Sequence, residues 1–513
     1  MPFPSVRIRP ASGARPAASS ERRRARAGVA TLALLVLGGC ATTAPLPDDP
    51  ADRASLCRAQ IDRVDAAVYG ADVEDGGAKR IEGFPWLRVT RPLASFADET
   101  DSDPRFDAWL ERLGQTAADA RRHELANLPA ERRNELADTW ATAAAQAGLP
   151  TGLRPGLTAC RDHLNRERLA SQDARDQLRE AAIAPDEYAT WQRVVGFYPI
   201  ARLVARPQIV DYQQERDAVF DEPANNPVRR YAVDSEGRGD AIETAREVER
   251  DALGIPAPTR TEAARLFDNH APVWAIATTT DADHPGALRL TDADRPAADT
   301  NRPAEYRRLS WTRFGDEVLL QLNYMIWFPE RPKEGAIDMY GGHLDGLMWR
   351  VTLAPDGEPL AYDSIHPCGC YYTLFPAEGW RIADMPGDAE PVASPARAPE
   401  YSATERLVVR ADSATHYLSG LESIERPVDD VTALAPLPFG QLRSLPRPDG
   451  GNASAFAPDG LIPSTARLER FFFWPFGVPS AGAMRQWGTH AVAFVGRRHF
   501  DDPRLLENLL EPE

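Results

Sequence analysis

The sequence predicts an α+β protein in which an N-terminal helical bundle is followed by a mainly antiparallel β C-terminal domain. Apolar residues recur with helical spacing through residues 51–205, whereas from about residue 306 they form short extended runs separated by turn signals. Residues 206–305 combine helix-breaking prolines, a charged helical segment and a run rich in Asp, Pro and Ala. We therefore expect a helical domain at 51–205, a mixed connector with helices at 206–305 and a β-rich domain at 306–513.

Four apolar stripes indicate helices in the first of these regions. The first stripe consists of Leu56, Ile61, Val64 and Val68. A second helix is expected at Asp103-Pro104, where an N-cap residue precedes proline at the first helical position. Its predicted core residues are Phe106, Trp109, Leu110 and Leu113. Further helices should follow Pro129 and begin near Leu157, and an apolar stretch at 191–204 completes the bundle.

The connector and the β-rich region differ in their helix-breaking residues and turn signals. Prolines break regular structure early in the connector, and a charged helix is expected at 241–253. In the β-rich region, residues 318–328 (VLLQLNYMIWF) form a candidate buried strand. Extended runs at 347–353 and 360–365 flank the turn signal Ala354-Pro355-Asp356-Gly357 and predict a hairpin. Further strands are expected at 406–410, 471–474 and 491–495.

Composition excludes some classes of function. The chain has 513 residues and a formal net charge of −17, and no basic face is visible in the sequence. Nucleic acid is therefore excluded as a partner, because binding to phosphates needs a concentration of positive charge. The apolar content of 43% is sufficient for substantial cores.

The first forty residues carry the most specific signal. Arg22, Arg23, Arg24 and Arg26 precede eleven residues, Ala27–Leu37, that are mainly apolar, and this run ends in Leu37-Gly38-Gly39-Cys40. Eleven residues are too few to cross a hydrocarbon core of about 30 Å, so the order of these features indicates a secretory leader.

The end of this leader resembles the lipobox of bacterial lipoproteins. The resemblance implies that residues 1–39 are a signal peptide, that Cys40 is acylated and becomes the N-terminus, and that residues 40–50 are a tether. The following residue is Ala41 rather than Asp, which in such lipoproteins favours the outer membrane. The expected location is the periplasmic face of that membrane, with the membrane bound through lipidated Cys40. An ordinary signal peptide is the alternative.

Cys57 and Cys160 are a candidate disulfide. Cys57 lies beside the first apolar stripe, and Cys160 shares a helical face with Leu157 and Leu164, so both thiols are expected to point into the bundle core. Two reduced core cysteines are the alternative.

The stretch IHPCGCYYTLF at 365–375 contains the other chemical motif. His366, Cys368 and Cys370 alternate along an extended chain, and their ligand types suit Zn²⁺ or Cu(I). A flat strand would spread them over about 13 Å, so one ion requires a bend at Gly369 and a further ligand. Candidates for that ligand are His343, His416 and His490. The alternatives are a Cys368–Cys370 disulfide, thiol redox or nucleophilic chemistry, and two inert buried thiols.

Residues 471–476 (FFFWPF) are followed by several arginines and by His490. Aromatic and arginine side chains together can bind glycans, haem edges or lipid headgroups, with His490 available as a haem ligand; a core strand with a polar flank is the structural alternative.

The expected function is an outer-membrane-anchored periplasmic lipoprotein that serves as a non-enzymatic envelope binding or scaffolding protein, with an envelope protein or a glycan as partner. The alternative is a metal-binding protein, with Zn or Cu as cofactor, or a thiol-redox protein that uses His366, Cys368 and Cys370.

Overall fold

The computed structural model describes residues 53–221, 226–234, 241–335, 338–386, 389–400 and 404–513. The predicted leader, Cys40 and the tether lie outside these ranges. The helices are α1 (Arg53–Gly70), α2 (Arg91–Ala94), α3 (Asp103–Asn127), α4 (Ala130–Ala147), α5 (Leu153–Arg168), α6 (Gln172–Ala181), α7 (Thr190–Val195), α8 (Tyr198–Asp221), α9 (Ala241–Glu247), α10 (Arg260–His270), α11 (Arg470–Phe473) and α12 (Leu505–Leu509), with 3₁₀ turns η1 (Ala97–Glu99), η2 (Asp281–Asp283), η3 (Phe439–Arg443), η4 (Pro463–Thr465) and η5 (Trp474–Phe476).

The strands are β1 (Lys79–Ile81), β2 (Phe84–Val89), β3 (Val228–Ala232), β4 (Val273–Ala277), β5 (Ala287–Leu290), β6 (Pro296–Asp299), β7 (Ala304–Phe314), β8 (Glu317–Arg331), β9 (Gly342–Leu353), β10 (Pro359–Ile365), β11 (Thr373–Pro376), β12 (Trp380–Ile382), β13 (Glu405–Ala411), β14 (Leu418–Glu425), β15 (Val431–Ala433), β16 (Ala435–Pro438), β17 (Leu445–Pro446), β18 (Asn452–Ala453) and β19 (Leu510–Pro512). Helices dominate the N-terminal half and antiparallel-rich sheets the C-terminal half, so the predicted α+β class is confirmed.

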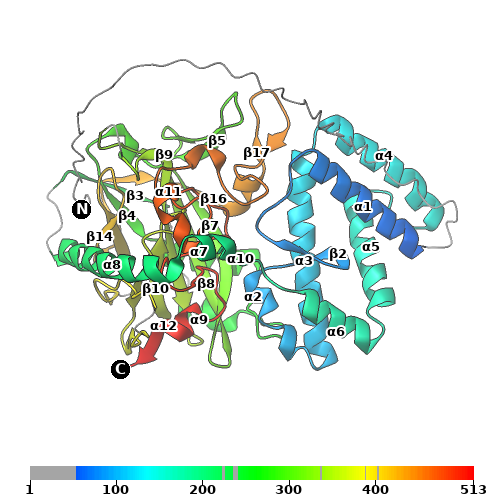
Figure 1. Ribbon diagram of the computed structural model, residues 1–513, viewed down its shortest axis with the longest axis horizontal. Helices are drawn as coiled ribbons and strands as arrows, with labels where there is room; N and C mark the ends of the chain where they lie inside the picture. The colour runs from blue at the N-terminus through cyan, green and yellow to red at the C-terminus, as the bar shows by residue number, and fades with distance from the viewer. Residues whose placement is uncertain (1–52, 222–225, 235–240, 336–337, 387–388, 401–403) are drawn as a thin grey trace, which may run out of the picture. The chain divides into compact units, whose positions relative to one another are not determined.

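The N-terminal helices pack around one apolar core. Helices α1, α4 and α5 lie side by side (Figure 1), and the predicted stripe on α1 is buried throughout. Helix α3 begins at Asp103 with Ser102 as its N-cap residue, one position before the predicted cap. The helical pattern missed one element: β1 and β2 form a short antiparallel hairpin, and β2 packs against α3.

Two larger sheets share a second core. Their strand orders are β11-β10-β9-β8-β7-β16 and β14-β13-β4-β3-β15, and most neighbouring strands are antiparallel. The predicted hairpin is confirmed as β9 and β10 around the turn at 354–357. Strands β3 and β4, which come from residues 206–305, pair within the same sheet as β13 and β14 from the C-terminal region.

Strand β8 has a long apolar run because both of its faces are buried. Residues at even positions from Leu320 to Phe328 contact the core that the two sheets share, whereas Leu319, Met325 and Trp327 face the core formed with the C-terminal segment. A strand covered on both faces loses the usual alternation of apolar and polar residues. Its polar exceptions are hydrogen-bonded: Gln321 donates to Thr352, and Asn323 donates to Ser310.

Two strand predictions were wrong. Residues 471–474 form α11 and the start of η5 instead, and residues 491–495 contain only an isolated bridge between Ala491 and His499. In the first segment, Pro475 has no N–H for a sheet ladder and Gly477 has a positive φ of 79°, so the chain turns rather than extends. The predicted helix at 241–253 is real but ends at Glu247.

The apolar stretch at 191–204 forms α7 and the first half of α8, but its large side chains point to solvent. Across the described ranges, no helix combines the length and the apolar character needed to span a bilayer.

Candidate functional site

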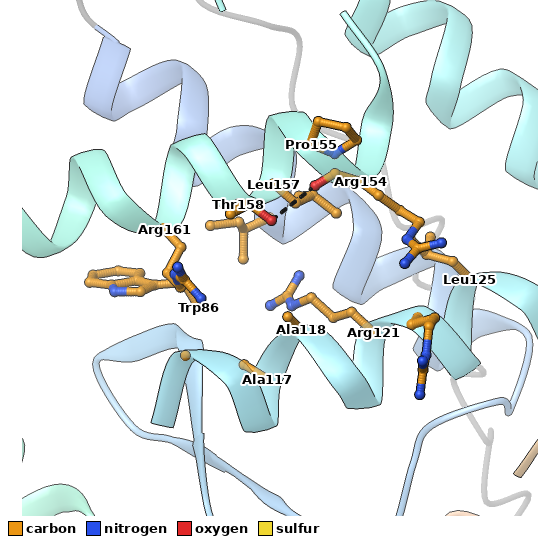
Figure 2. A pocket seen from close by; sticks show the side chains of 13 residues that line it. Trp86, Ala117, Ala118, Arg121, Leu125, Arg154, Pro155, Leu157, Thr158 and Arg161 are labelled. Atoms are coloured by element: carbon orange, nitrogen blue, oxygen red, sulfur yellow. Dashed lines mark hydrogen bonds between the residues drawn. The ribbon is translucent and has the colours of Figure 1, made fainter. Parts of the chain in front are cut away.

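A pocket of about 430 Å³ lies in the helical region between α3 and α5 (Figure 2). Four arginines line it, namely Arg121, Arg122, Arg154 and Arg161. The remaining lining residues include Ile61 of α1, Trp86 of β2, and Leu125 and Leu157. The pocket therefore combines guanidinium groups with an apolar wall.

Small residues on α3 provide the space for these long side chains. Gly114, Ala117 and Ala118 face α5 across the pocket. A Cβ atom added to Gly114 would lie 2.7 Å from Cδ of Arg161, so glycine allows Arg161 to lie directly over α3. The indole of Trp86 is fixed at the other side, because its Nε1 donates to Oδ1 of Asn165 at 2.7 Å.

Arg121 is the most buried of the four arginines, at 6% exposure. Its Nη2 donates to the carbonyl oxygen of Pro85 at 2.6 Å and lies 3.3 Å from Oδ1 of Asp65, whereas its buried Nη1 has no hydrogen-bond partner. Burial lowers the pKa of Arg121 despite the nearby charge of Asp65. An uncompensated buried donor is costly, and an acceptor supplied by a ligand would remove that cost.

Two of the other arginines pair with partly exposed carboxylates. Arg122 pairs with Asp119, and Arg161 pairs with Asp162 and Glu111; these carboxylates are 43–53% exposed. Ion pairs of such exposed groups are worth little in water, so they leave the guanidinium groups available to a stronger anionic partner.

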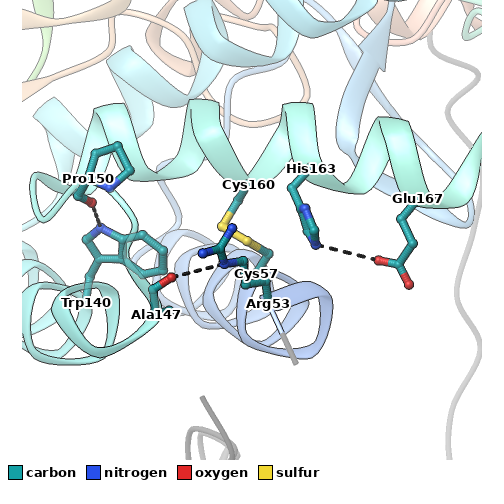
Figure 3. The surroundings of a disulfide bond; sticks show 8 residues. All are labelled: Arg53, Cys57, Trp140, Ala147, Pro150, Cys160, His163 and Glu167. Atoms are coloured by element: carbon teal, nitrogen blue, oxygen red, sulfur yellow. Dashed lines mark hydrogen bonds and ion pairs between the residues drawn. A yellow bond between two sulfur atoms is a disulfide. The ribbon is translucent and has the colours of Figure 1, made fainter. Parts of the chain in front are cut away.

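The Cys57–Cys160 disulfide ties α1 to α5 (Figure 3). The Cα atoms of the two cysteines are 5.1 Å apart, and both residues are fully buried. Arg53 donates to the carbonyl oxygen of Ala147 at 3.1 Å and links α1 to α4 nearby. The disulfide therefore fixes α5, the helix that carries Arg154 and Arg161.

The motif at 366–370 forms a buried turn. The N–H of Gly369 donates to the carbonyl oxygen of His366, and the N–H of His366 donates to the carbonyl oxygen of Cys370. Gly369 has a positive φ of 89°, and an added Cβ would lie 2.4 Å from the carbonyl oxygen of Ala491. Glycine is therefore required both by the bend and by the close packing of the C-terminal segment.

Cys368 and Cys370 are both free thiols in this turn. The N–H of Cys370 lies 3.4 Å from Sγ of Cys368. A hydrogen bond with Cys368, together with burial, raises the pKa of Cys370 well above its usual range. Because the thiolate is both the nucleophile and the metal ligand, this environment holds Cys370 in its unreactive form.

The predicted histidine ligands have other partners. His343 Nε2 lies 2.7 Å from the carbonyl oxygen of Pro296, away from the turn. His490 does approach the turn, with Nε2 3.1 Å from the carbonyl oxygen of Pro367. Among the residues that the structure describes, no three His, Cys, Asp or Glu side chains are grouped so that they could hold a metal ion.

His366 instead belongs to a chain of buried acids and imidazoles. Its Nδ1 lies 3.2 Å from Oδ1 of Asp345, and the other oxygen of Asp345 lies 3.0 Å from Nδ1 of His416. His416 Nε2 is 3.5 Å from Oδ1 of Asp283. The chain therefore runs from Asp283 through His416 and Asp345 to His366, and it joins η2, β9, the β13–β14 loop and the turn after β10.

The protonation of these four buried side chains follows from their contacts. Burial acts against charge at each member, but hydrogen bonds with both carboxylates raise the pKa of His416, and contacts with His366 and His416 hold the pKa of Asp345 well below its usual range. Burial lowers the pKa of His366. These shifts favour the protonated form of His416 between the two carboxylates and the neutral form of His366, whose Nε2 is buried without a hydrogen-bond partner.

Sequence reasoning missed most of these residues. Neither Asp345, which is fully buried, nor any of the pocket arginines was singled out from the sequence. The one available signal was the seven-residue spacing of Arg154 and Arg161, which places both on the same face of α5.

No protein-family model matches this chain, and neither a curated protein nor a solved structure shows significant similarity to it.

Proposed function

We propose that this chain is an outer-membrane-anchored periplasmic lipoprotein that acts as a non-enzymatic envelope binding protein and receives an anionic ligand in its arginine-lined pocket. The observation that carries the binding role is Arg121, whose buried guanidinium lies between α3 and α5 with one unsatisfied donor nitrogen (Figure 2). A carboxylate or phosphate group is the natural acceptor for this donor.

The size and lining of the pocket narrow the ligand further. A volume of about 430 Å³ falls within the range of small-molecule sites, about 300 to 1,000 Å³. Trp86 and Leu157 provide apolar surface beside the arginines, which suits a sugar ring or another weakly polar body that carries the anionic group. An acidic envelope glycan combines these properties.

The geometry favours this role over the metal or thiol-redox alternative. The raised pKa of Cys370 keeps its thiol protonated, and among the described residues no three His, Cys, Asp or Glu side chains are grouped so that they could hold a metal ion. Both features argue against metal binding or thiol chemistry at the 366–370 turn and support a role for it in packing.

The pocket can be tested with inorganic pyrophosphate and citrate as separate calorimetric probes of phosphate and carboxylate binding. Replacing Arg121 or Arg154 by Gln should raise the Kd of the bound probe on the order of tenfold or more, because each change removes charge-assisted hydrogen bonds. Arg168→Gln is the matched control, since Arg168 lies on α5 but is exposed and outside the pocket. Failure of both probes to bind, or equal losses in all three variants, would contradict the proposal.

The anchor is tested independently of the pocket. Labelled palmitate should be incorporated into the chain and should be lost in Cys40→Ser, and label that persists in this variant excludes Cys40 as the acylated residue. Because Cys40 is not part of the pocket, probe binding should be the same in this variant as in the wild type.

A further inference from the structure

A second surface of the molecule presents an unusual concentration of exposed apolar side chains. Of the thirteen exposed large apolar residues in the described ranges, eight lie on α7, the first half of α8 and α11, and a ninth, Phe197, lies between α7 and α8. These nine residues are 60–71% exposed, and we call them the apolar patch: Trp191, Val194, Val195, Phe197, Ile200, Leu203, Val204, Phe471 and Phe472. Single exposed apolar residues are ordinary in proteins, but a group of this size indicates a binding surface.

Two segments far apart in the sequence form the apolar patch, and they share one support. The N–H of Ala189 donates to the carbonyl oxygen of Gly477 at 2.7 Å, and Nε of Arg193 donates to that of Phe476 at 2.7 Å. Gly196 lies so close to η5 that an added Cβ would be 2.6 Å from Cα of Pro475. Helix α7 is therefore fixed beside η5, and η5 follows directly after α11, the helix that carries Phe471 and Phe472.

The first half of helix α8 exposes apolar residues to solvent, unlike an ordinary surface helix. At its start the exposed positions are Pro199, Ile200, Leu203, Val204 and Pro207, whereas further along they include Gln208, Asp211 and Gln214. A surface helix normally presents its polar face to water. The first half of α8 is inverted in this respect, so its apolar face is suited to contact with something other than water.

Charge distinguishes this surface from the rest of the chain. Residues 188–210 contain no Asp or Glu but contain Arg193, Arg202 and Arg206, and residues 470–500 contain no acid either. Arg470 is exposed and stacks on Phe471, with Cζ 4.7 Å from the ring centroid. In a chain of net charge −17, an apolar patch whose own segments, 188–210 and 470–500, carry arginines and no acids matches an anionic apolar surface.

We propose that the apolar patch is a membrane-docking surface that inserts its aromatic and aliphatic side chains among anionic phospholipids. Trp and Phe with neighbouring Arg are the residues that favour the boundary between headgroups and acyl chains. The anchor proposed above strengthens this choice, because thirteen residues from Cys40 to Arg53 span at most about 45 Å and would hold the folded part near the bilayer. The docking surface itself does not depend on that anchor.

Flotation with vesicles of phosphatidylethanolamine and phosphatidylglycerol tests the proposal, with the chain of residues 41–513 so that neither the proposed leader nor an acyl group contributes. This protein should float with the anionic vesicles and much less with vesicles of phosphatidylcholine alone. The double changes Phe471→Ser with Phe472→Ser, and Ile200→Ser with Leu203→Ser, should each lower the partition coefficient about tenfold or more. Arg202→Glu should lower binding to the anionic vesicles only.

Matched controls lie on other exposed parts of the chain. Tyr69→Ser with Ile183→Ser removes two similarly exposed apolar side chains outside the patch, and Arg166→Glu reverses an exposed charge on α5. Both should bind vesicles as the parent does. Equal losses in patch and control variants, or absence of vesicle binding by the parent, would overturn the proposal. So would sedimentation showing that the patch residues instead join two copies of the chain. A negative palmitate result with intact vesicle binding would refute the anchor alone.

Discussion

At the residue scale, the most constrained feature is the buried chain of Asp283, His416, Asp345 and His366. Asp345 contacts both imidazoles, and the His416 ring also stacks on Phe328 with centroids 3.8 Å apart. Buried charges of this kind are tolerated only when each has a partner. Removal of the central carboxylate should therefore affect the fold more than removal of an exposed one.

Asp345→Asn should lower the free energy of unfolding by about 3 to 5 kcal/mol, because buried His416, whose protonated form is favoured by two carboxylates, then loses one of them. Chemical denaturation of the two proteins at neutral pH measures this difference. Asp316→Asn is the control, since Asp316 is exposed in the turn between β7 and β8 and its loss should change stability by no more than about 0.5 kcal/mol. Similar small losses at both positions would mean that His416 needs only Asp283.

The free energy of unfolding should depend on pH through the protonation of His490. Burial lowers the pKa of His490 from 6.5 to about 3. As the pH falls below 6.5, the unfolded chain takes up a proton that the folded chain refuses, so the free energy of unfolding falls by up to about 1.4 kcal/mol per pH unit until the pH nears 3. His490→Gln should remove this contribution, although it lowers stability at all pH values.

Denaturation of wild type and His490→Gln between about pH 7 and pH 4 tests this prediction. The difference between the two curves isolates His490 from Glu469, whose pKa burial raises to about 7 and which therefore acts with the opposite sign. The stability difference should shrink as the pH falls. Parallel curves would show that His490 does not control acid sensitivity.

At the scale of elements, α4 and α5 pack unusually closely around Trp140. A Cβ atom added to Gly156 on α5 would lie 2.2 Å from Nε1 of Trp140, whose indole is held by a hydrogen bond to the carbonyl oxygen of Pro150. The ring is fully buried and has no room to move away. The contact between the two helices therefore depends on the absence of a side chain at Gly156.

Gly156→Ala should lower the free energy of unfolding by about 1 to 3 kcal/mol through overpacking, although alanine has the higher helix propensity. Gly70→Ala provides the matched helical change, because no atom lies within 4 Å of the Cβ position at the end of α1. That variant should be neutral or slightly stabilised. Thermal or urea denaturation compares them, and a neutral Gly156→Ala would imply that α4 shifts freely against α5.

Elements with a strong local pattern could be predicted from the sequence, whereas elements fixed by tertiary contacts could not. The run at 318–328 and the turn at 354–357 predicted β8 and the β9–β10 hairpin correctly. Residues 471–474 look like a strand by composition, yet they form α11 and the start of η5, and η5 packs against α7 from a distant part of the chain. The side on which 191–204 is exposed was equally unpredictable, since hydrophobicity alone implies burial.

At the scale of the whole molecule, the candidate sites are assembled across long stretches of sequence. The pocket joins residues from α1, β2, α3 and α5, and the buried acid–histidine chain joins Asp283 to residues more than sixty positions away. Local spacing identified His366, Cys368 and Cys370, but it could not reveal that their turn is covered by Arg485 and Ala491 from the C-terminal segment. Chemistry-bearing residue types are visible in a sequence, but their partners require the fold.

The Cys57–Cys160 disulfide closes the longest covalent loop in the described structure, with a sequence separation of 103. Opening it by Cys57→Ser with Cys160→Ser should lower the free energy of unfolding by about 4 to 5 kcal/mol in the chain-entropy model, because the unfolded chain regains the freedom that the loop removes. Urea denaturation of the full chain measures this loss. A thiol titration of the Cys40→Ser chain in denaturant should find two reactive thiols, Cys368 and Cys370, before reduction and four after it. Four thiols before reduction would exclude the disulfide. Because this bond fixes the helix that carries Arg154 and Arg161, anion binding should also be measured in the variant that lacks both cysteines.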